Sequence, residues 1–154
     1  METSNRTNNQ NHFNIRVYGI VIENNHLLLA DEFFKGLKMT KFPGGGLEFG
    51  EGTIDCLRRE AHEELNCEID ICRHYYTTDY FQPALFFEHT QFISIYYAIK
   101  LRNPSSYPIS KKPSYPLTSQ QPNFRWVPIA DLNVTDLTFP IDQKVAEMII
   151  QEHL

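Results

Sequence analysis

A glycine-rich loop that runs into an acidic helix occupies residues 44–67 and constrains this chain more than any other stretch. Three consecutive glycines open it, and glycine permits close approach of the backbone to a ligand. The helix is expected to begin with Thr53 as its N-cap and to end at Asn66, a residue that tolerates the left-handed conformation after a helix. Its apolar residues recur at helical spacing and should face the core: Ile54, Leu57, Ala61 and Leu65.

The same helix carries three glutamates on one flank, at the edge of that apolar face. Glu60, Glu63 and Glu64 are separated by three or four residues, a spacing that places side chains side by side on a helix. Neighbouring carboxylates repel one another unless a cation joins them. A set of oxygen ligands suits Mg²⁺ or Mn²⁺ better than zinc. The stretch therefore predicts a divalent-cation site, which a carbonyl of the glycine loop could complete.

These residues resemble the Nudix box, whose consensus is G-x5-E-x7-R-E-U-x-E-E-x-G-U, where U is a bulky aliphatic residue. Asn66 stands where the consensus has its last glycine, and Ala61 and Cys67 are small for aliphatic positions. The positions that match at the consensus spacing are Gly45, Glu51, Arg59, Glu60, Glu63 and Glu64.

The resemblance implies roles for particular residues. Metal ligands would be Glu60, Glu63, Glu64 and the carbonyl of Gly44, and the implied metal is Mg²⁺ or Mn²⁺. Glu60 is the first candidate for the general base, whereas Glu51 and Arg59 would brace the loop against the helix. Two further contacts known in the family have no counterpart here. Acidic residues stand at positions 31 and 32, where a phosphate-binding arginine is common, and glutamines at 120 and 121, where an extra acid is common.

Substrate contacts are therefore expected from other residues. Lysines near the loop could meet phosphate, an aromatic side chain could stack a base, and a glutamate outside the helix could complete the metal site. The residues assigned to these roles, together with the loop glycine, are Gly45, Lys35, Lys41, Phe34 and Glu88.

The implied reaction is hydrolysis of a phosphoanhydride bond in a nucleoside diphosphate linked to another moiety, such as a nucleoside triphosphate, ADP-ribose or another sugar nucleotide. The implied fold is α/β, the Nudix α/β/α sandwich with a mixed β-sheet between helices, over residues 13–154. A non-catalytic module of the same fold that senses a nucleotide or ADP-sugar is the alternative, and an isomerase is a lesser one. A homodimer also stays open, as does the choice of substrate.

Composition and short motifs argue against several other classes of protein. The net charge of −5 argues against duplex nucleic acid or an anionic membrane as a partner. No apolar stretch is long enough to span a bilayer, and the first residues lack the apolar core of a secretory signal. The three cysteines read as reduced thiols, which predicts a cytoplasmic protein. His62-Glu63 opens a zinc-protease pattern, but Asn66 takes the place of its second histidine.

Patterning along the rest of the chain predicts the order of elements. Residues 1–12 are polar and asparagine-rich, which predicts a disordered tail before a single domain at 13–154. Pro140 should open an amphipathic C-terminal helix. The proline- and serine-rich segment 102–122 predicts a long loop of open role. Strands are predicted at 13–23, 26–31, 68–81, 91–101 and 124–127, with a loop and a short strand between 31 and 43.

Overall fold

The computed structural model describes residues 10–118 and 120–154. Most of the predicted disordered tail, residues 1–9, lies outside this part, and His12 is already the first residue of a strand. The first two long strands form a hairpin, β1 (His12–Glu23) and β2 (His26–Phe34). Asn24 and Asn25, the two residues between the predicted strands, connect them with φ angles of 49° and 60°, as a two-residue hairpin turn requires.

The strands form a mixed seven-stranded sheet with the order β3-β2-β1-β6-β5, while β4 pairs with β1 and β7 with β2. Its central ladder is the parallel pairing of β1 with β6, from His12 and Thr90 to Val21 and Ile99. Every other strand pairing is antiparallel within the described residues. The remaining strands are β3 (Leu37–Lys41), β4 (Gly44–Gly46), β5 (Glu68–Thr77), β6 (Thr90–Arg102) and β7 (Asn123–Pro128).

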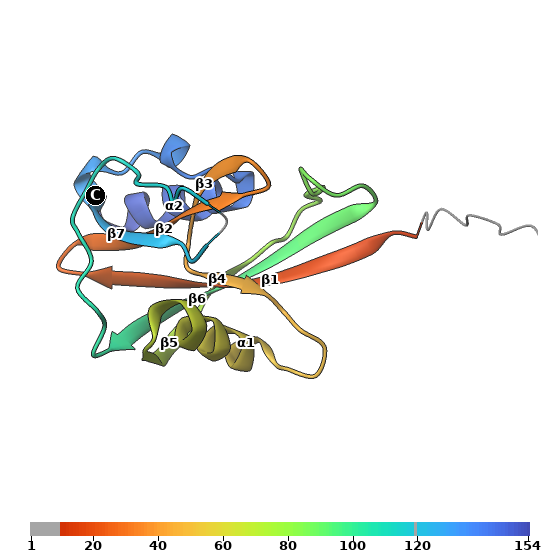
Figure 1. Cartoon of the computed structure of the whole chain (residues 1–154), viewed down its shortest axis with the longest axis horizontal. Helices are drawn as coiled ribbons and strands as arrows, with labels where there is room; N and C mark the ends of the chain where they lie inside the picture. The colour runs from red at the N-terminus through yellow and green to blue at the C-terminus, as the bar shows by residue number, and fades with distance from the viewer. Residues whose placement is uncertain (1–9, 119) are drawn as a thin grey trace, which may run out of the picture.

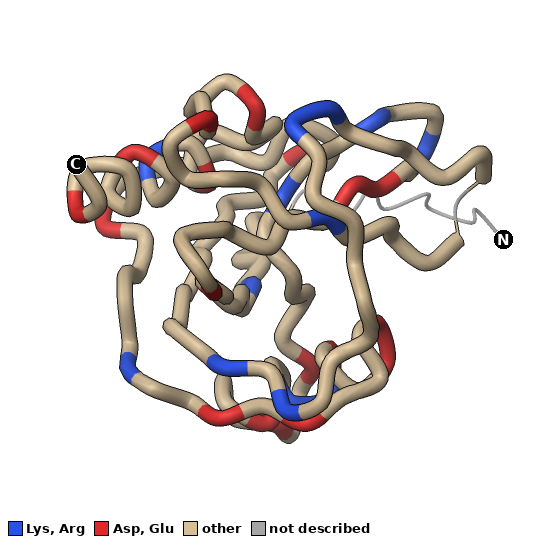
Figure 2. Tube along the Cα trace, turned by 90° about the vertical axis from the view of Figure 1, so that its left-hand side faces the viewer, with Lys and Arg blue, Asp and Glu red and all other residues tan. Residues whose placement is uncertain are grey.

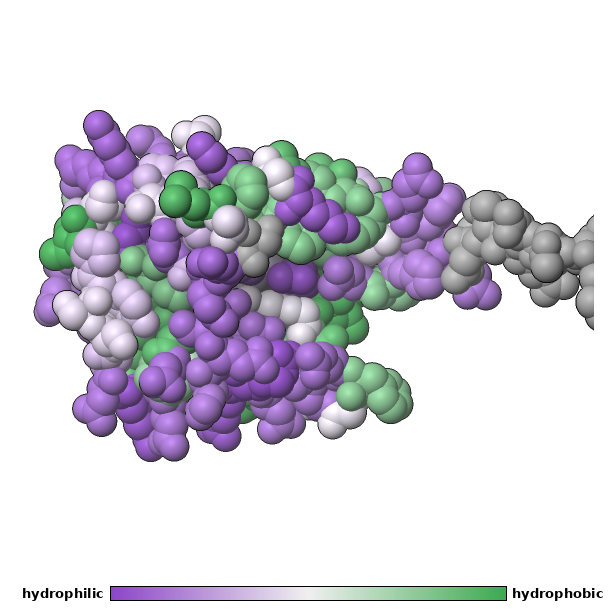
Figure 3. Space-filling model, viewed as in Figure 1, coloured by the Kyte–Doolittle hydropathy of each residue, from purple (hydrophilic) through white to green (hydrophobic). Residues whose placement is uncertain are grey.

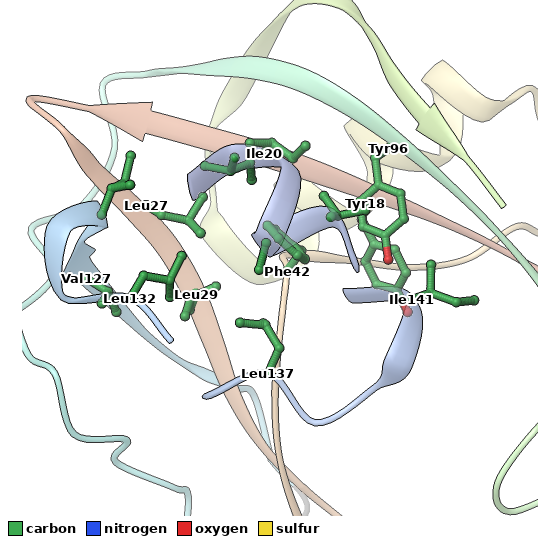
Figure 4. Close-up of a cluster of buried hydrophobic side chains, with 14 residues drawn as sticks. Tyr18, Ile20, Leu27, Leu29, Phe42, Tyr96, Val127, Leu132, Leu137 and Ile141 are labelled. Atoms are coloured by element: carbon green, nitrogen blue, oxygen red, sulfur yellow. The ribbon is translucent and has the colours of Figure 1, made fainter. Parts of the chain in front are cut away.

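Helices cover both faces of the sheet, which confirms the α/β/α sandwich (Figure 1). On one face, α1 (Thr53–Glu60) and the π-helical turn η1 (Ala61–Leu65) pack on one apolar cluster. On the other, α2 (Pro140–Glu152) packs on a second cluster with the 3₁₀ turns η2 (Ile129–Asp131) and η3 (Val134–Asp136). The second cluster includes Tyr18 and Tyr96, whose rings lie side by side with centroids 5.3 Å apart (Figure 4). No helix of residues 10–118 or 120–154 has the length and hydropathy needed to cross a membrane.

The acidic helix differs from the prediction in three details. Gly52, and not Thr53, is its N-cap, and the Gly52 N–H donates to Asp55 Oδ2 at 3.0 Å. Ile54 is 37% exposed, while Cys56 is fully buried in its place. The regular α-helix stops at Glu60 and continues as a π-helical turn over residues 61–65, and Asn66 follows as its C-cap. Asn66 adopts φ 49°, the left-handed conformation that was expected.

The segment after Asp31 also differs from the prediction. Instead of a loop, β2 runs on to Phe34 and turns through Lys35 and Gly36 into β3, which makes a second hairpin. Both turn residues have positive φ, at 48° and 77°. The turn is Lys-Gly and lacks the asparagine that often marks a two-residue hairpin turn. The sequence of this segment therefore predicts a loop.

The predicted long loop is present and is fastened to the sheet by a buried ion pair. Arg125 Nε of β7 donates to Asp31 Oδ2 of β2 at 2.8 Å, and both side chains are at most 3% exposed. The same carboxylate oxygen accepts the Ser114 N–H at 3.0 Å, and Arg125 Nη1 donates to the Ser110 carbonyl at 3.0 Å. Asp31 therefore stabilises the fold and holds the loop, and does not contact the cavity described below.

Replacing Asp31 with alanine should destabilise the protein by about 3–5 kcal/mol, because it leaves the Arg125 guanidinium buried without a partner. The matched control is Asp70→Ala, which breaks an Asp–Arg pair with Arg102 whose side chains are 47% and 56% exposed. That change should cost at most about 1 kcal/mol. Urea unfolding of both variants measures the difference, and equal losses would contradict the role given to the buried pair.

Candidate active site

The glycine loop meets the acidic helix at closest range through Gly45. A Cβ atom on Gly45 would lie 2.3 Å from Glu60 Oε1, so no other residue fits without displacing that carboxylate. Gly44 has φ +145°, and a Cβ there would lie 2.1 Å from the Val17 carbonyl oxygen. Both glycines belong to β4, which pairs with β1 at residues 16–18. The Glu60 carboxylate consequently lies directly against the backbone of the loop.

Arg59 joins the loop to the helix through a fork of hydrogen bonds. Its Nε and Nη2 donate to the two carboxylate oxygens of Glu51 at 3.0 and 2.7 Å, and Nη2 also donates to the Gly46 carbonyl at 3.0 Å. Nη1 donates to Glu60 Oε1 at 3.0 Å. Hydrogen bonding to Arg59 lowers the pKa of Glu51 to about 2. These contacts fix the loop, the helix and the Glu60 carboxylate relative to one another.

The π-helical turn sets the directions of the next two glutamates. π-helical turns are uncommon and occur frequently at functional sites. Glu64 lies inside a cavity together with Glu60, whereas the Glu63 side chain is 56% exposed and lies outside its lining. Arg59 Nη1 reaches Glu63 Oε2 at 3.5 Å. The three glutamates share one flank, but only two of them face the cavity.

Glu64 is a carboxylate in an unfavourable environment. Its pKa is raised to about 7, mainly by burial. The positive charge of Lys41 opposes this effect, and the neighbouring carboxylates Glu60, Glu32 and Glu63 add to it. Among residues 10–118 and 120–154, the Glu64 side chain makes neither a hydrogen bond nor an ion pair within the distance limits of such contacts. Negative charge is therefore concentrated here without a partner for Glu64.

This carboxylate set fits a hard divalent cation by its donor chemistry. Oxygen ligands are those that Mg²⁺ and Mn²⁺ prefer, and a cation beside Glu64 would stabilise the charged form that burial and neighbouring carboxylates disfavour. In the described part of the chain, no three His, Cys, Asp or Glu side chains are already arranged as a complete ligand set. The residues placed to hold an ion are Glu60 and Glu64, with the Gly44 carbonyl lining the same cavity.

The cavity has a volume of about 350 Å³, within the range of small-molecule sites. Figure 3 shows mostly hydrophilic residues over the lower part of the molecule, where α1 lies in Figure 1, and a mixture of hydrophilic and hydrophobic residues above. Basic and acidic residues are mixed at the height of α1 (Figure 2). Away from the carboxylates the lining is mainly apolar and includes Tyr18, Phe34, Leu85, Phe86, Phe87, Phe92, Tyr96, Phe139 and Ile141.

The structure brings together some of the residues selected from the sequence and separates others. The cavity lining includes Gly44, Gly45, Phe34, Lys41, Glu60 and Glu64. Residues outside the lining are Lys35, Glu51, Arg59, Glu63 and Glu88. Lys35 instead lies at the hairpin turn, with its Nζ 4.8 Å from the centroid of the Phe87 ring.

Several lining residues were not selected from the sequence: Arg16, Tyr18, Glu32 and Asp142. The sequence does contain a pattern that relates Arg16 to Tyr18. Asn14, Arg16 and Tyr18 alternate along β1, and residues two apart in a strand point to the same face. Nothing in the sequence indicates that this face of β1 lies beside the glycine loop, because the pairing with β4 is a tertiary contact.

Asp142, in the first turn of α2, is the second buried acid at the cavity. It accepts a hydrogen bond from the Tyr96 hydroxyl through Oδ1, while Oδ2 has no partner among the described residues. Burial raises the pKa of Asp142 to about 6, in spite of opposing effects of the Tyr96 hydrogen bond and of Lys41. Around Asp142, as around Glu64, the cavity therefore disfavours a negatively charged side chain.

A family model described as NUDIX domain matches residues 13–148. The chain belongs to the NUDIX family. Membership supports a hydrolase and agrees with the resemblance found in the glycine loop and acidic helix. No curated protein matches the sequence.

Solved structures share this NUDIX fold at low sequence identity. A NUDIX hydrolase from Nitrosomonas europaea is 18% identical with a TM-score of 0.69, over 92% of this chain and 90% of that one. A MutT NUDIX hydrolase from Burkholderia pseudomallei is 12% identical with a TM-score of 0.68, over 90% and 98%. An ADP-ribose pyrophosphatase from Streptococcus suis is 12% identical with a TM-score of 0.59, over 91% and 90%. At these identities the likeness establishes the fold alone.

Replacing Glu64 with glutamine should stabilise this NUDIX domain when no divalent metal is present, and only at higher pH. Folding raises the pKa of Glu64 from 4.5 to about 7, so the folded state disfavours the charged form. The stability of the parent protein should fall as the pH rises from about 4.5 to 7, and the variant should lack this fall. Above pH 7 the variant should gain up to about 3 kcal/mol.

Urea unfolding in EDTA between pH 4.5 and 8 measures this difference. Glu63→Gln is the matched control, because the Glu63 side chain is 56% exposed and its removal should have little pH-dependent effect. A gain from Glu64→Gln that is the same at every pH would contradict the electrostatic explanation. With Mg²⁺ added, the parent protein should be stabilised more than the variant, since a ligand of the native state raises its stability.

Proposed function

We propose that this chain hydrolyses a phosphoanhydride bond in a nucleoside diphosphate linked to another moiety, with Mg²⁺ or Mn²⁺ as its cofactor. The supporting observation is that Glu60, Glu64, the glycine loop and several aromatic side chains all line one cavity. Such a cavity can take a compound that is highly charged at one end and planar and apolar at the other.

Glu60 and Glu64, with the Gly44 carbonyl, would hold the divalent ion. When bound, the ion supplies charge neutralisation for the diphosphate and makes the attacking water more acidic. Among the protein groups, Glu60 is the assigned base or ligand, and Arg59 fixes its carboxylate through a hydrogen bond of 3.0 Å. Phosphoryl chemistry depends mainly on positioning and charge, so a rigid carboxylate beside the loop suits it.

The remainder of the substrate would occupy the aromatic part of the cavity. Phe34 of β2 and Phe139 before α2 both belong to this part, and flat side chains can stack against a nucleobase. The substrate class we propose includes nucleoside triphosphates, ADP-ribose and other sugar nucleotides. Structures with the same fold carry the names UDP-X diphosphatase and ADP-ribose pyrophosphatase, which is compatible with this range.

The experiment that tests this function is product release from a panel of these nucleotides with Mg²⁺. Glu60→Gln and Glu64→Gln should each lower kcat by about a hundredfold or more, because each removes a carboxylate from the reacting centre. Glu68→Gln, at the exposed start of β5, is the control and should keep full activity. Unchanged turnover in both cavity variants would contradict the assigned roles.

A sensor that binds a nucleotide or ADP-sugar without cleaving it is the second candidate. The observation that favours it is that Gln120 and Gln121 stand where the family often has an extra acid for the metal site. The panel separates the two functions. Tight binding of one compound without turnover of any, under Mg²⁺ and under Mn²⁺, would establish the sensor.

A further inference from the structure

Two basic side chains converge on one buried tyrosine inside the cavity. Arg16 Cζ lies 5.7 Å, and Lys41 Nζ 5.8 Å, from the centroid of the Tyr18 ring. Arg16 Nε also donates a hydrogen bond to the Tyr18 hydroxyl at 2.6 Å. Tyr18 is 4% exposed and packs in the core, so it is a rigid support for both cations. All three side chains line the cavity that contains Glu60 and Glu64.

The two cations differ in how their charge is balanced. Lys41 Nζ lies 3.1 Å from Glu32 Oε1 and 3.5 Å from the Gly44 carbonyl oxygen. Arg16 has no carboxylate within ion-pair distance among residues 10–118 and 120–154, although it is only half-exposed. The other described arginines that are not fully exposed, Arg59 and Arg125, each have one.

An unpaired guanidinium in a cavity is costly unless a ligand pairs with it. With Nε held by Tyr18, the two Nη groups of Arg16 remain as donors in a planar fork, the geometry that matches phosphate oxygens. The fork lies at the glycine loop, since a Cβ on Gly46 would be 3.6 Å from Arg16 Nη1. An anion bound next to the loop would therefore meet the free Nη groups of Arg16.

We propose that Arg16 binds a phosphate group of the substrate, with Tyr18 as its positioning residue and Lys41 as a second positive charge. This phosphate clamp rests on the proposed function, because its ligand is the diphosphate of that substrate. The guanidinium and the carboxylates Glu60 and Glu64 line the same cavity, so the clamp and a divalent ion would both act on one diphosphate. Positions 31 and 32, where a phosphate-binding arginine is common in the family, are acidic in this chain. Arg16 of β1 and Lys41 of β3 would supply the positive charge instead.

The test measures binding of inorganic pyrophosphate by calorimetry, once in EDTA and once with Mg²⁺, and does not depend on turnover. Arg16→Gln should weaken binding about 10- to 100-fold in both conditions, the range expected for losing hydrogen bonds to a charged ligand. Arg16→Lys keeps the charge but not the fork and should be intermediate. Tyr18→Phe keeps the ring but frees Arg16 Nε, and should weaken binding by a smaller factor.

The matched control is Arg58→Gln, since Arg58 is an exposed arginine of α1 outside the cavity lining. It should bind pyrophosphate like the parent protein. Binding by Arg16→Gln within twofold of the parent, or no binding by the parent in either condition, would overturn the clamp. Melting temperatures identify any variant that has lost its fold. If Arg16→Gln does not fold, the pyrophosphate affinity of Arg16→Lys decides whether the clamp is correct.

The result separates this inference from the proposed function. Pyrophosphate binding that depends on Arg16, without hydrolysis of any nucleotide, would keep the clamp and reject the hydrolase. Hydrolysis with a KM unchanged in Arg16→Gln would reject the clamp and keep the hydrolase. If the clamp and the hydrolase function are both correct, KM for the nucleotide should rise in Arg16→Gln by a factor similar to the loss of pyrophosphate affinity.

Discussion

The hydrogen bonds of Arg59 connect the two segments on which the site depends. One guanidinium contacts the Glu51 carboxylate, the Gly46 carbonyl and Glu60 Oε1 at 2.7 to 3.0 Å. Without it, the loop and the helix would be joined mainly by apolar packing, which does not fix the direction of a carboxylate. A planar group with five donors holds these acceptors in a fixed fork, a geometry that the three rotatable donors of lysine do not impose. The position of Glu60 against Gly45 follows from this arrangement.

Charge in the cavity is organised around groups that lack a full set of partners. Glu64 has its pKa raised to about 7 by burial, and Arg16 faces the cavity without a carboxylate. The charged form of Glu64 is therefore disfavoured in the free protein. Together Glu64 and Arg16 favour a cation near the carboxylates and an anion near the guanidinium. A metal-bound diphosphate supplies both, so binding it would relieve electrostatic costs that the fold imposes.

The sequence was sufficient for most of the fold. Local backbone preferences specify three of its parts. The alternation of residues 13–23 specifies a strand, the paired asparagines 24 and 25 a turn, and Pro140 the start of a helix. The sequence failed where tertiary contacts decide: the hairpin at Lys35-Gly36 depends on β2 pairing with β3, and the burial of Cys56 instead of Ile54 depends on how α1 sits on the sheet. The π-helical turn at 61–65 has the same sequence pattern as an ordinary helix.

For the site, the sequence by itself determined the residues of the glycine loop and acidic helix, because their spacing along one continuous segment is local. Only the tertiary structure decided which side chains share the cavity. It placed Arg16, Tyr18 and Asp142 there from distant parts of the chain, and it left Lys35 and Glu88 outside. Contacts between separate strands and helices depend on how the sheet assembles, and the spacing of residues within one element carries no information about that assembly.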